Sequence, residues 1–154
     1  MGVEERIKVV EVLALGIDPP VIADADTSLR EIVREMRDRR ASCALLTRED
    51  RLAGVFTERD VVTRVAGVHG VLDGPVAEVM TSDPEHIRPG DRLSTAVRLM
   101  RRHGYRHVPV VDDDGRILGC VRHEDVVGYL AEVYPEVLNL PPDPDQVILT
   151  REGG

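Results

Sequence analysis

The feature of this sequence that most constrains its fold is an internal repeat. Asp18-Pro19 recurs as Asp83-Pro84, 65 positions later, and Ile22/Ile87 and Asp26/Asp91 keep that interval. Skipping Ser28 shortens the interval to 64 and aligns Leu29/Leu93, Val33/Val97, Arg34/Arg98, Met36/Met100 and Arg37/Arg101. An additional residue in a later turn restores 65 and aligns Gly54/Gly119, Asp60/Asp125, Val61/Val126 and Val62/Val127. Because self-similarity at a fixed spacing indicates a reused structural unit, we expect two copies of one unit.

Each copy begins with a similar segment, Glu11-Val12-Leu13 in the first and Glu78-Val79-Met80 in the second. A short β-prone run then precedes a segment whose apolar residues have the i, i+3, i+4, i+7 spacing of an amphipathic helix. These residues are Leu29, Ile32, Val33 and Met36 in the first copy, and Leu93, Ala96, Val97 and Met100 in the second. Ser28 with Glu31 predicts a capping box for the first helix. Asp91 is expected to cap the second helix and Gly104 to end it.

Two strands and a second helix follow in each copy. The strands are expected over 44–47 and 52–56 in the first copy, and over 108–111 and 117–121 in the second. The second pair is joined by Asp112-Asp113-Asp114-Gly115, which favours a hairpin. Helices are expected near 58–65 and 123–132. The order of elements is therefore β-α-β-β-α, twice.

A unit of this kind has helices on one face of a small sheet and leaves the other face uncovered. Two units packed sheet to sheet bury that face and leave clefts at the boundary between them, where small molecules commonly bind. The predicted fold is therefore α/β (α+β): two tandem β-α-β-β-α repeats packed sheet to sheet with pseudo-two-fold symmetry.

The repeats also divide the chain into segments. We assign 1–67 to the first repeat with its N-terminal lead-in, 68–75 to a linker, 76–134 to the second repeat and 135–154 to a Pro-rich tail. The connector over 67–75 contains Gly67, Gly70, Gly74 and Pro75, which predicts a flexible link. The tail is expected to be extended or loosely docked.

Charge and composition exclude several classes of function. Lys and Arg total 20 against 28 Asp and Glu, a net charge of −8, and the chain has one Phe and no Trp. We therefore expect no nucleic-acid partner, since both phosphate attraction and base stacking are weak. No apolar run approaches the ~18 residues of a membrane helix and no signal pattern is present, so we expect a cytoplasmic protein with no membrane partner. Two cysteines are too few for a disulfide framework or a zinc site.

The chemistry is concentrated where the third strand of each repeat runs into the following helix. The first repeat has Gly54-Val55-Phe56-Thr57-Glu58-Arg59-Asp60 there. In one interpretation Thr57 only caps the helix and Asp60 lies in its first turn. In the other, the helix start faces the cleft, and the Asp60 carboxylate accepts both hydroxyls of a ribose. The second repeat keeps the Asp, as Asp125, but has Arg122 in place of Thr57, which favours the second interpretation.

These patterns resemble a known family. The duplicated β-α-β-β-α unit, the Gly-h-h-Thr-x-x-Asp turn (h, hydrophobic) and Tyr105-Arg106-His107-Val108-Pro109-Val110-Val111-Asp112 are similar to a CBS-domain pair, the Bateman module. The resemblance covers about residues 7–133, so we expect a stand-alone pair. It implies a regulatory module that binds an adenosine-containing ligand between the repeats, forms a homodimer and signals to an unknown effector protein.

The resemblance also implies the residues of two composite sites. The first site would use Thr57, Asp60 and Arg59, with Ile87 against adenine and Arg106 and His107 toward phosphate. The second site would use Asp125 and Arg122, facing Ile22 and Ser42. The second departs from the family pattern because Arg122 replaces a Thr or Ser, and because Ala41-Ser42-Cys43 has no basic residue.

AMP, ADP or ATP is the expected ligand, with no obligatory cofactor and no metal. S-adenosylmethionine and NAD(H) share the same adenosyl contacts and stay open. An acidic protein needs local donors to hold phosphate, and arginine forms strong, often bidentate bonds to it. The alternative is a ligand-free dimerisation module that recruits a partner protein, with helices such as 93–101 paired across the dimer. We expect no enzyme, since no Ser-His-Asp or Cys-His set has supporting context.

Overall fold

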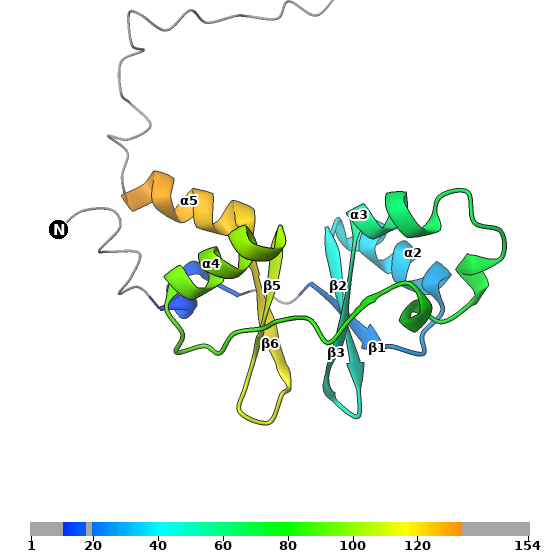
Figure 1. Cartoon of the computed structure of the whole chain (residues 1–154), viewed down its shortest axis with the longest axis horizontal. Helices are drawn as coiled ribbons and strands as arrows, with labels where there is room; N and C mark the ends of the chain where they lie inside the picture. Colours follow the sequence, from blue (N-terminus) through cyan, green and yellow to red (C-terminus); the bar gives the residue numbers. More distant parts are fainter. Residues whose placement is uncertain (1–10, 18–19, 134–154) are drawn as a thin grey trace, which may run out of the picture.

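The computed structural model of the chain describes residues 11–17 and 20–133. Two similar halves lie side by side in it, with their strands in the middle and their helices outside (Figure 1). The first half contains β1 (Val21–Asp24), α2 (Leu29–Arg39), β2 (Cys43–Arg48), β3 (Arg51–Thr57), α3 (Glu58–Asp60) and the π-helical turn η2 (Val61–Val65). The second contains α4 (Leu93–His103), β5 (His107–Val111), β6 (Ile117–Arg122) and α5 (His123–Val133). Short 3-10 turns η1 (Val12–Leu15), η3 (Val71–Asp73) and η4 (Val76–Glu78), and strand β4 (Thr81–Ser82), lie in the segments that lead into the repeats.

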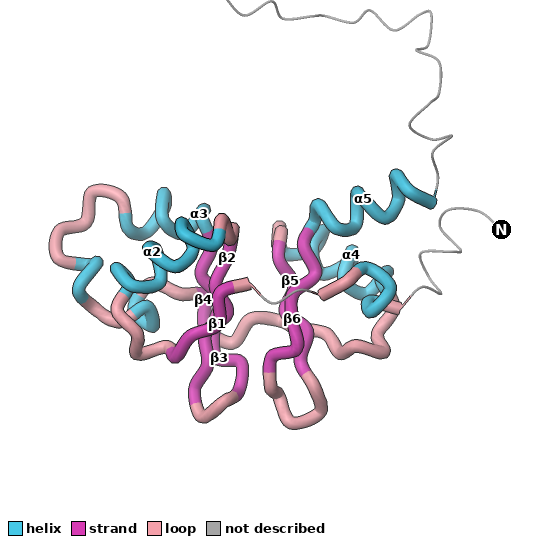
Figure 2. The backbone as a smooth tube through the Cα atoms, turned by 180° about the vertical axis from the view of Figure 1, so that it is seen from behind, coloured by secondary structure: helices cyan, strands magenta, loops and turns pink. Residues whose placement is uncertain are grey.

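The predicted β-α-β-β-α order is confirmed in the first repeat and nearly so in the second. The first sheet has the order β1-β2-β3-β4, with β1 parallel to β2 and the other pairs antiparallel. The second sheet pairs β5 with β6, and its first strand is reduced to a single parallel bridge between Ile87 and Val110. The tube view shows the two sheets facing each other (Figure 2).

The inner faces of the two sheets meet in a small apolar cluster, which we call the seam. It consists of Cys43, Leu45, Val55 and Cys120, with Leu52 and Ile117 against it. These residues come from both repeats, so each sheet covers the face that the other leaves open. Sheet-to-sheet packing is therefore confirmed, and the seam is the place where the two repeats make contact through their strands.

Two of the three predicted helix ends are confirmed. Ser28 is the N-cap of α2, where its Oγ accepts a hydrogen bond from the Glu31 amide at 3.3 Å. Gly104 ends α4 in the left-handed conformation, φ 69°. Asp91, in contrast, does not cap α4: Arg92 is the N-cap, and the Asp91 carboxylate accepts from the Arg88 amide at 2.8 Å instead. The prediction for Asp91 was wrong because its side chain closes the preceding turn.

The segment that leads into each repeat, which contains Val12 in the first and Val76 in the second, packs against the core of the other repeat. We call these two segments the lead-ins. The Val12 amide donates to the Asp91 carbonyl at 3.0 Å, and Val12 is fully buried in the core of the second repeat. The Val76 amide donates to the Thr27 carbonyl at 2.9 Å, and Val76 is fully buried in the core of the first. The segment that precedes the first repeat in sequence therefore completes the second repeat in space.

These hydrogen bonds correct the alignment of the repeats. Glu11 bridges Arg92 and Pro75 bridges Ser28, so the lead-in Glu11-Val12 corresponds to Pro75-Val76, not to Glu78-Val79. The strand register agrees with an interval of 64 up to the end of β2. Ala23 pairs with Leu46 as Ile87 pairs with Val110, which makes Ile87 the equivalent of Ala23 rather than of Ile22. Identical side chains were misleading here because main-chain pairing, not side-chain identity, defines structural equivalence.

The connector is more ordered at its C-terminal end than a flexible link would be. The Leu29 amide donates to the Gly74 carbonyl at 2.9 Å, and Val71 and Leu72 pack on the first core. Arg30 forms an ion pair with Asp73 at 2.9 Å. The expected Pro-rich tail, 135–154, lies outside the described residues. No helix among the residues that the structure describes is long and apolar enough to cross a membrane.

The exchange of lead-ins predicts that a change at Val12 destabilises the protein. Val12→Ala removes buried methyl groups from the second core and should lower the free energy of unfolding by about 2 kcal/mol. The neighbouring Leu13 is exposed, so Leu13→Ala should change stability by less than about 0.5 kcal/mol. Urea denaturation of both variants tests this, and equal effects would contradict the packing of Val12.

Candidate ligand site at the seam

The start of α3 holds a buried carboxylate. Thr57 is the N-cap and forms a capping box with Asp60. The Thr57 amide donates to Asp60 Oδ2 at 2.8 Å, and the Thr57 hydroxyl donates to the same oxygen at 3.1 Å. The other oxygen, Oδ1, has Arg64 Nε at 3.5 Å. Asp60 is 8% exposed, and among the residues that the structure describes it is the single charged residue that is buried. One oxygen of this carboxylate, Oδ2, is thus held by the amide and the hydroxyl of Thr57, while Oδ1 has a longer contact with Arg64.

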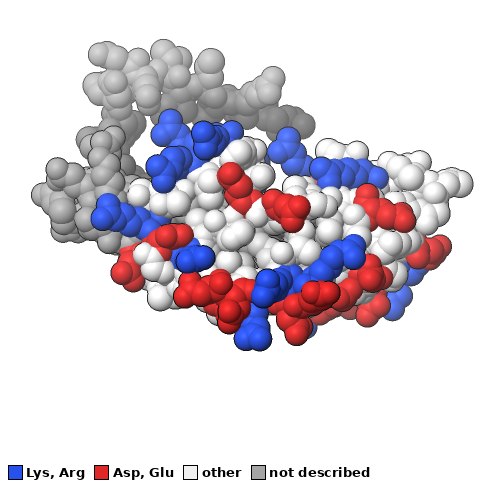
Figure 3. Space-filling model, turned by 60° about the horizontal axis from the view of Figure 1, so that its bottom comes forward, with Lys and Arg blue, Asp and Glu red and all other residues white. Residues whose placement is uncertain are grey.

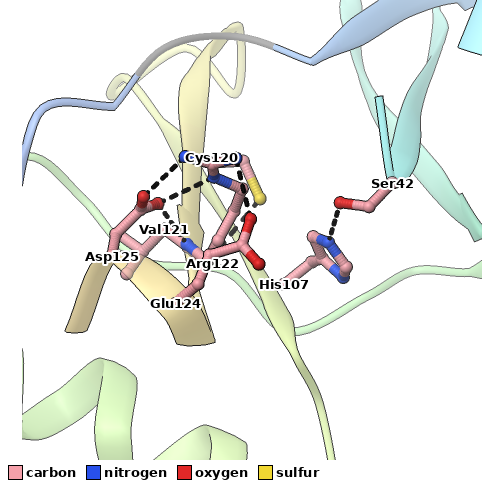
Figure 4. Close-up of polar contacts among 7 residues, drawn as sticks. All are labelled: Ser42, His107, Cys120, Val121, Arg122, Glu124 and Asp125. Atoms are coloured by element: carbon pink, nitrogen blue, oxygen red, sulfur yellow. Dashed lines mark hydrogen bonds and ion pairs between the residues drawn. The ribbon is translucent and has the colours of Figure 1, made fainter. Parts of the chain in front are cut away.

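The equivalent start of α5 has a different arrangement (Figure 4). The Arg122 amide donates to Asp125 Oδ2 at 3.0 Å. The Arg122 guanidinium also donates from Nε to Oδ2 at 3.0 Å and from Nη2 to Oδ1 at 2.6 Å. Its third nitrogen, Nη1, lies 2.8 Å from Glu124 Oε1. Hydrogen bonding to Asp125 raises the pKa of Arg122 above its usual value.

One side-chain hydrogen bond crosses between the repeats in this region. Ser42 Oγ, just before β2, lies 2.7 Å from His107 Nε2, the first residue of β5 (Figure 4). Burial lowers the pKa of His107 below the ordinary 6.5; Arg122 and Arg106 lower it further, while Glu124 and Glu58 oppose them. The imidazole is therefore neutral at pH 7. The structure thus joins one residue from each expected site.

The strand starts are tied to the helix starts in both repeats. The Glu58 amide donates to the Ser42 carbonyl at 3.1 Å, and the His123 amide donates to the Arg106 carbonyl at 2.8 Å. Thr57, Ser42, His107 and Arg122 therefore lie at the same end of the two sheets. Arg59 and Arg106 are exposed there.

The two isoleucines expected to contact adenine differ in exposure. Ile87 is 2% exposed and belongs to the core of the second repeat, with Val12 and Leu93. Ile22 is exposed on β1. The alignment that made these two residues equivalent is the one that the strand register corrects, and this accounts for their different surroundings.

Sequence reasoning missed two neighbours of the site, Arg64 and Glu124. Arg64 pairs with Asp60 at the i, i+4 spacing of helical ion pairs, a signal that was present in the sequence. Glu124 pairs with Arg122, its second neighbour in the chain, and only the side-chain conformation shows this. Cys43 and Cys120 are free buried thiols that meet at the seam, as expected of small buried side chains. The Cys43 thiol, and after it burial, raise the pKa of Cys120.

A hollow of about 410 Å³ lies where α2 ends and α3 begins, lined by Val33, Met36, Arg37, Arg40, Ala41, Glu58 and Val61. It is on the outer side of the first repeat rather than at the seam. Basic and acidic side chains mix along the end of the molecule that carries the hairpins (Figure 3), where Arg88 pairs with Asp113 at 3.0 Å. Within the described residues, no three potential metal ligands cluster.

Comparison with known proteins identifies the family. Residues 12–67 and 76–132 each match the CBS domain family. These two segments contain most of the chain, and each holds one of the observed repeats. The protein therefore belongs to the CBS domain family and carries a tandem pair of these domains.

Individual relatives agree with this assignment. A CBS domain protein from Pyrobaculum aerophilum, complexed with AMP, is 29% identical with a TM-score of 0.72, over 85% of this chain and 100% of that one. A CBS domain pair in complex with 5′-methylthioadenosine and S-adenosyl-L-methionine has the same fold, with a TM-score of 0.72 at 21% identity, over 81% of this chain and 98% of that one. An uncharacterized 17.7 kDa protein of Acidianus ambivalens is 26% identical over 73% of this chain and 68% of its own length. Other curated relatives are longer, and this chain spans 16% to 50% of their length.

The lowered pKa of His107 predicts a pH dependence of stability. An unfolded chain binds a proton at this residue near pH 6.5, whereas the folded chain resists it, so the contribution to stability is full above 6.5 and decreases as the pH falls below that value. Denaturant unfolding at several pH values between 7.5 and 5 should show a steeper loss for the native protein than for His107→Gln, whose amide can still bond to Ser42. Parallel curves for the two proteins would show that His107 does not contribute.

Proposed function

We propose that this CBS-domain pair is a sensor that binds an adenosine-containing ligand of the AMP, ADP or ATP class between its repeats. The Asp60 carboxylate is the observation that carries this proposal. Its Oδ2 is held by Thr57, while Oδ1 has only a long contact with Arg64. A carboxylate accepts hydrogen bonds from both hydroxyls of a ribose. The relative complexed with AMP and the pair complexed with S-adenosyl-L-methionine support the same ligand class.

The remaining contacts at the first site follow from charge. Arg59 and Arg106 are exposed near the start of α3 and the start of β5, and their guanidinium groups can bind phosphate oxygens. His107 can donate to phosphate once its bond to Ser42 is released. Because the core of the second repeat covers Ile87, we leave this residue out of the proposed contacts.

Occupancy is transmitted, we propose, through the bond between Ser42 and His107. A phosphate group that takes the His107 proton donor competes with Ser42, which belongs to the other repeat. Ligand binding would then favour a different arrangement of the repeats, as differential affinity for two states requires. An effector protein that distinguishes these arrangements would receive the signal.

This chain acts, we propose, by binding rather than by catalysis. Three solved chains of the family are 96% to 100% covered by the match, so they contain little besides the region shared with this chain. The residues at both helix starts are explained by capping and by ligand contacts. We therefore assign them binding roles.

A homodimer is part of the proposal and of its alternative, a dimerisation module that needs no ligand. Val62 is 73% exposed and Val127, its equivalent in the second repeat, is 51% exposed. Both follow the helix starts, in η2 and α5. Large apolar side chains exposed at equivalent positions favour a surface that a second copy covers.

The dimer surface is tested by charge substitution. Val62→Asp and Val127→Asp should convert a dimer to a monomer in light scattering after size exclusion, because a buried carboxylate without a partner is costly. Val68→Asp is the control, since Val68 is equally apolar and exposed but lies in the connector. A monomeric native protein would remove the dimer from both proposals.

Ligand binding is tested by a thermal-shift and titration panel of AMP, ADP, ATP, NAD(H), 5′-methylthioadenosine and S-adenosylmethionine. At one hundred times its dissociation constant, a ligand should stabilise the protein by ~2.7 kcal/mol. Asp60→Ala should abolish the shift, and Asp60→Asn, which can still accept from the Thr57 amide, should abolish it without loss of fold. No shift with any of these compounds would favour the ligand-free dimerisation module.

A further inference from the structure

The two repeats place equivalent carboxylates, Asp60 and Asp125, in two different hydrogen-bonding environments. Thr57 pairs with Cys43 as Arg122 pairs with His107, so Asp60 and Asp125 occupy equivalent positions. The main-chain contacts of the two carboxylates are the same. The amide three residues before each Asp donates to Oδ2, at 2.8 Å in the first repeat and 3.0 Å in the second. Any difference between the two sites therefore comes from side chains.

The side chains leave the two carboxylates with different capacity for a ligand. In the first repeat the Thr57 hydroxyl shares Oδ2, and Oδ1 has Arg64 Nε at 3.5 Å. In the second, the Arg122 guanidinium bonds to both Asp125 oxygens, at 3.0 and 2.6 Å. Bidentate arginine–carboxylate pairs are among the strong hydrogen bonds of proteins. Ribose hydroxyls would have to displace this pair at Asp125 but not at Asp60.

The charged neighbours of the two carboxylates are also arranged differently. Arg59 directly precedes Asp60, whereas Glu124 directly precedes Asp125 and binds Arg122 Nη1 at 2.8 Å. Each helix start nevertheless has one acidic and one basic neighbour besides its Asp, Glu58 with Arg59 in the first repeat and Glu124 with Arg122 in the second. The two sites therefore differ in the hydrogen bonding of the Asp carboxylate rather than in net charge.

We infer that Arg122 is a built-in occupant of the second site, which makes the pair a sensor with one nucleotide site per chain. This inference rests on the proposed function and changes the role of Arg122: it closes the Asp125 site rather than binding phosphate there. The single site lies at Thr57 and Asp60.

Isothermal titration with AMP tests the inference through stoichiometry. The native chain should bind one AMP per chain, and Arg122→Thr, which restores the first repeat's side chain at this position, should bind two. Arg122→Ser gives the same readout if threonine disturbs the strand end. The matched control is Arg98→Thr, which removes an equal charge from the exposed side of α4 and should leave one AMP per chain.

Exchanging the residue in the other direction gives a second test. Thr57→Arg places a guanidinium beside Asp60 and should abolish AMP binding while circular dichroism stays unchanged. The double variant Asp60→Ala with Arg122→Thr should bind one AMP per chain, now at the second site. Both results would show that the side chain at this position decides whether a site is open.

The outcomes separate the inference from the proposed function. One AMP bound to both the native chain and Arg122→Thr would overturn the inference and leave the proposed function standing. Two AMP bound to the native chain, with one lost in Asp125→Ala, would overturn it also, because Arg122 would then yield to the ligand. AMP binding by Arg122→Thr but not by the native chain would support the closing role of Arg122 and refute the first site. No binding by either protein would refute both.

Discussion

A small sheet with helices on one face has an apolar opposite face, and covering that face is the constraint on which this molecule depends. The cost of leaving it in water is removed when two copies of the unit pack strand against strand. Leu45 and Val55 of one repeat meet Cys120 of the other there. The same packing brings the starts of β2 and β5 close enough for Ser42 to bond to His107. The proposed ligand site therefore depends on the burial of the two apolar sheet faces against each other.

Duplication keeps the scaffold while side chains diverge. Main-chain amides at both helix starts hold an Asp in the same way, so the fold supplies two equivalent positions for a carboxylate. What differs is the side chain three residues earlier and the two residues between it and the Asp. Thr57 bonds to Oδ2 of Asp60 and leaves Oδ1 with a long contact to Arg64, whereas Arg122 bonds to both oxygens of Asp125. A symmetric architecture thus carries an asymmetric chemistry.

Most of the fold could be predicted from the sequence, because hydrophobic periodicity and turn residues define its helices and hairpins. Strand and helix ends were located to within a residue or two, and Ser28 and Gly104 act as expected. The exchange of lead-ins could not be predicted, because it depends on contacts between distant segments. The two Asp positions of the candidate site followed from the repeat. The pairing of Arg122 with its own neighbours did not, since one arginine can reach either a ligand or a carboxylate.

The exchanged lead-ins also affect how the chain is assembled during synthesis. The first repeat gains the segment that completes its core, around Val76, soon after its own strands are made. The second repeat needs Val12, which leaves the ribosome well before Ile87 and Leu93 do. Until then Val12 lacks the core that buries it, and the contact that closes the second core joins some of the most distant parts of the described chain. Such long-range closure is slow, so the segment around Val12 is among the last to reach its native contacts.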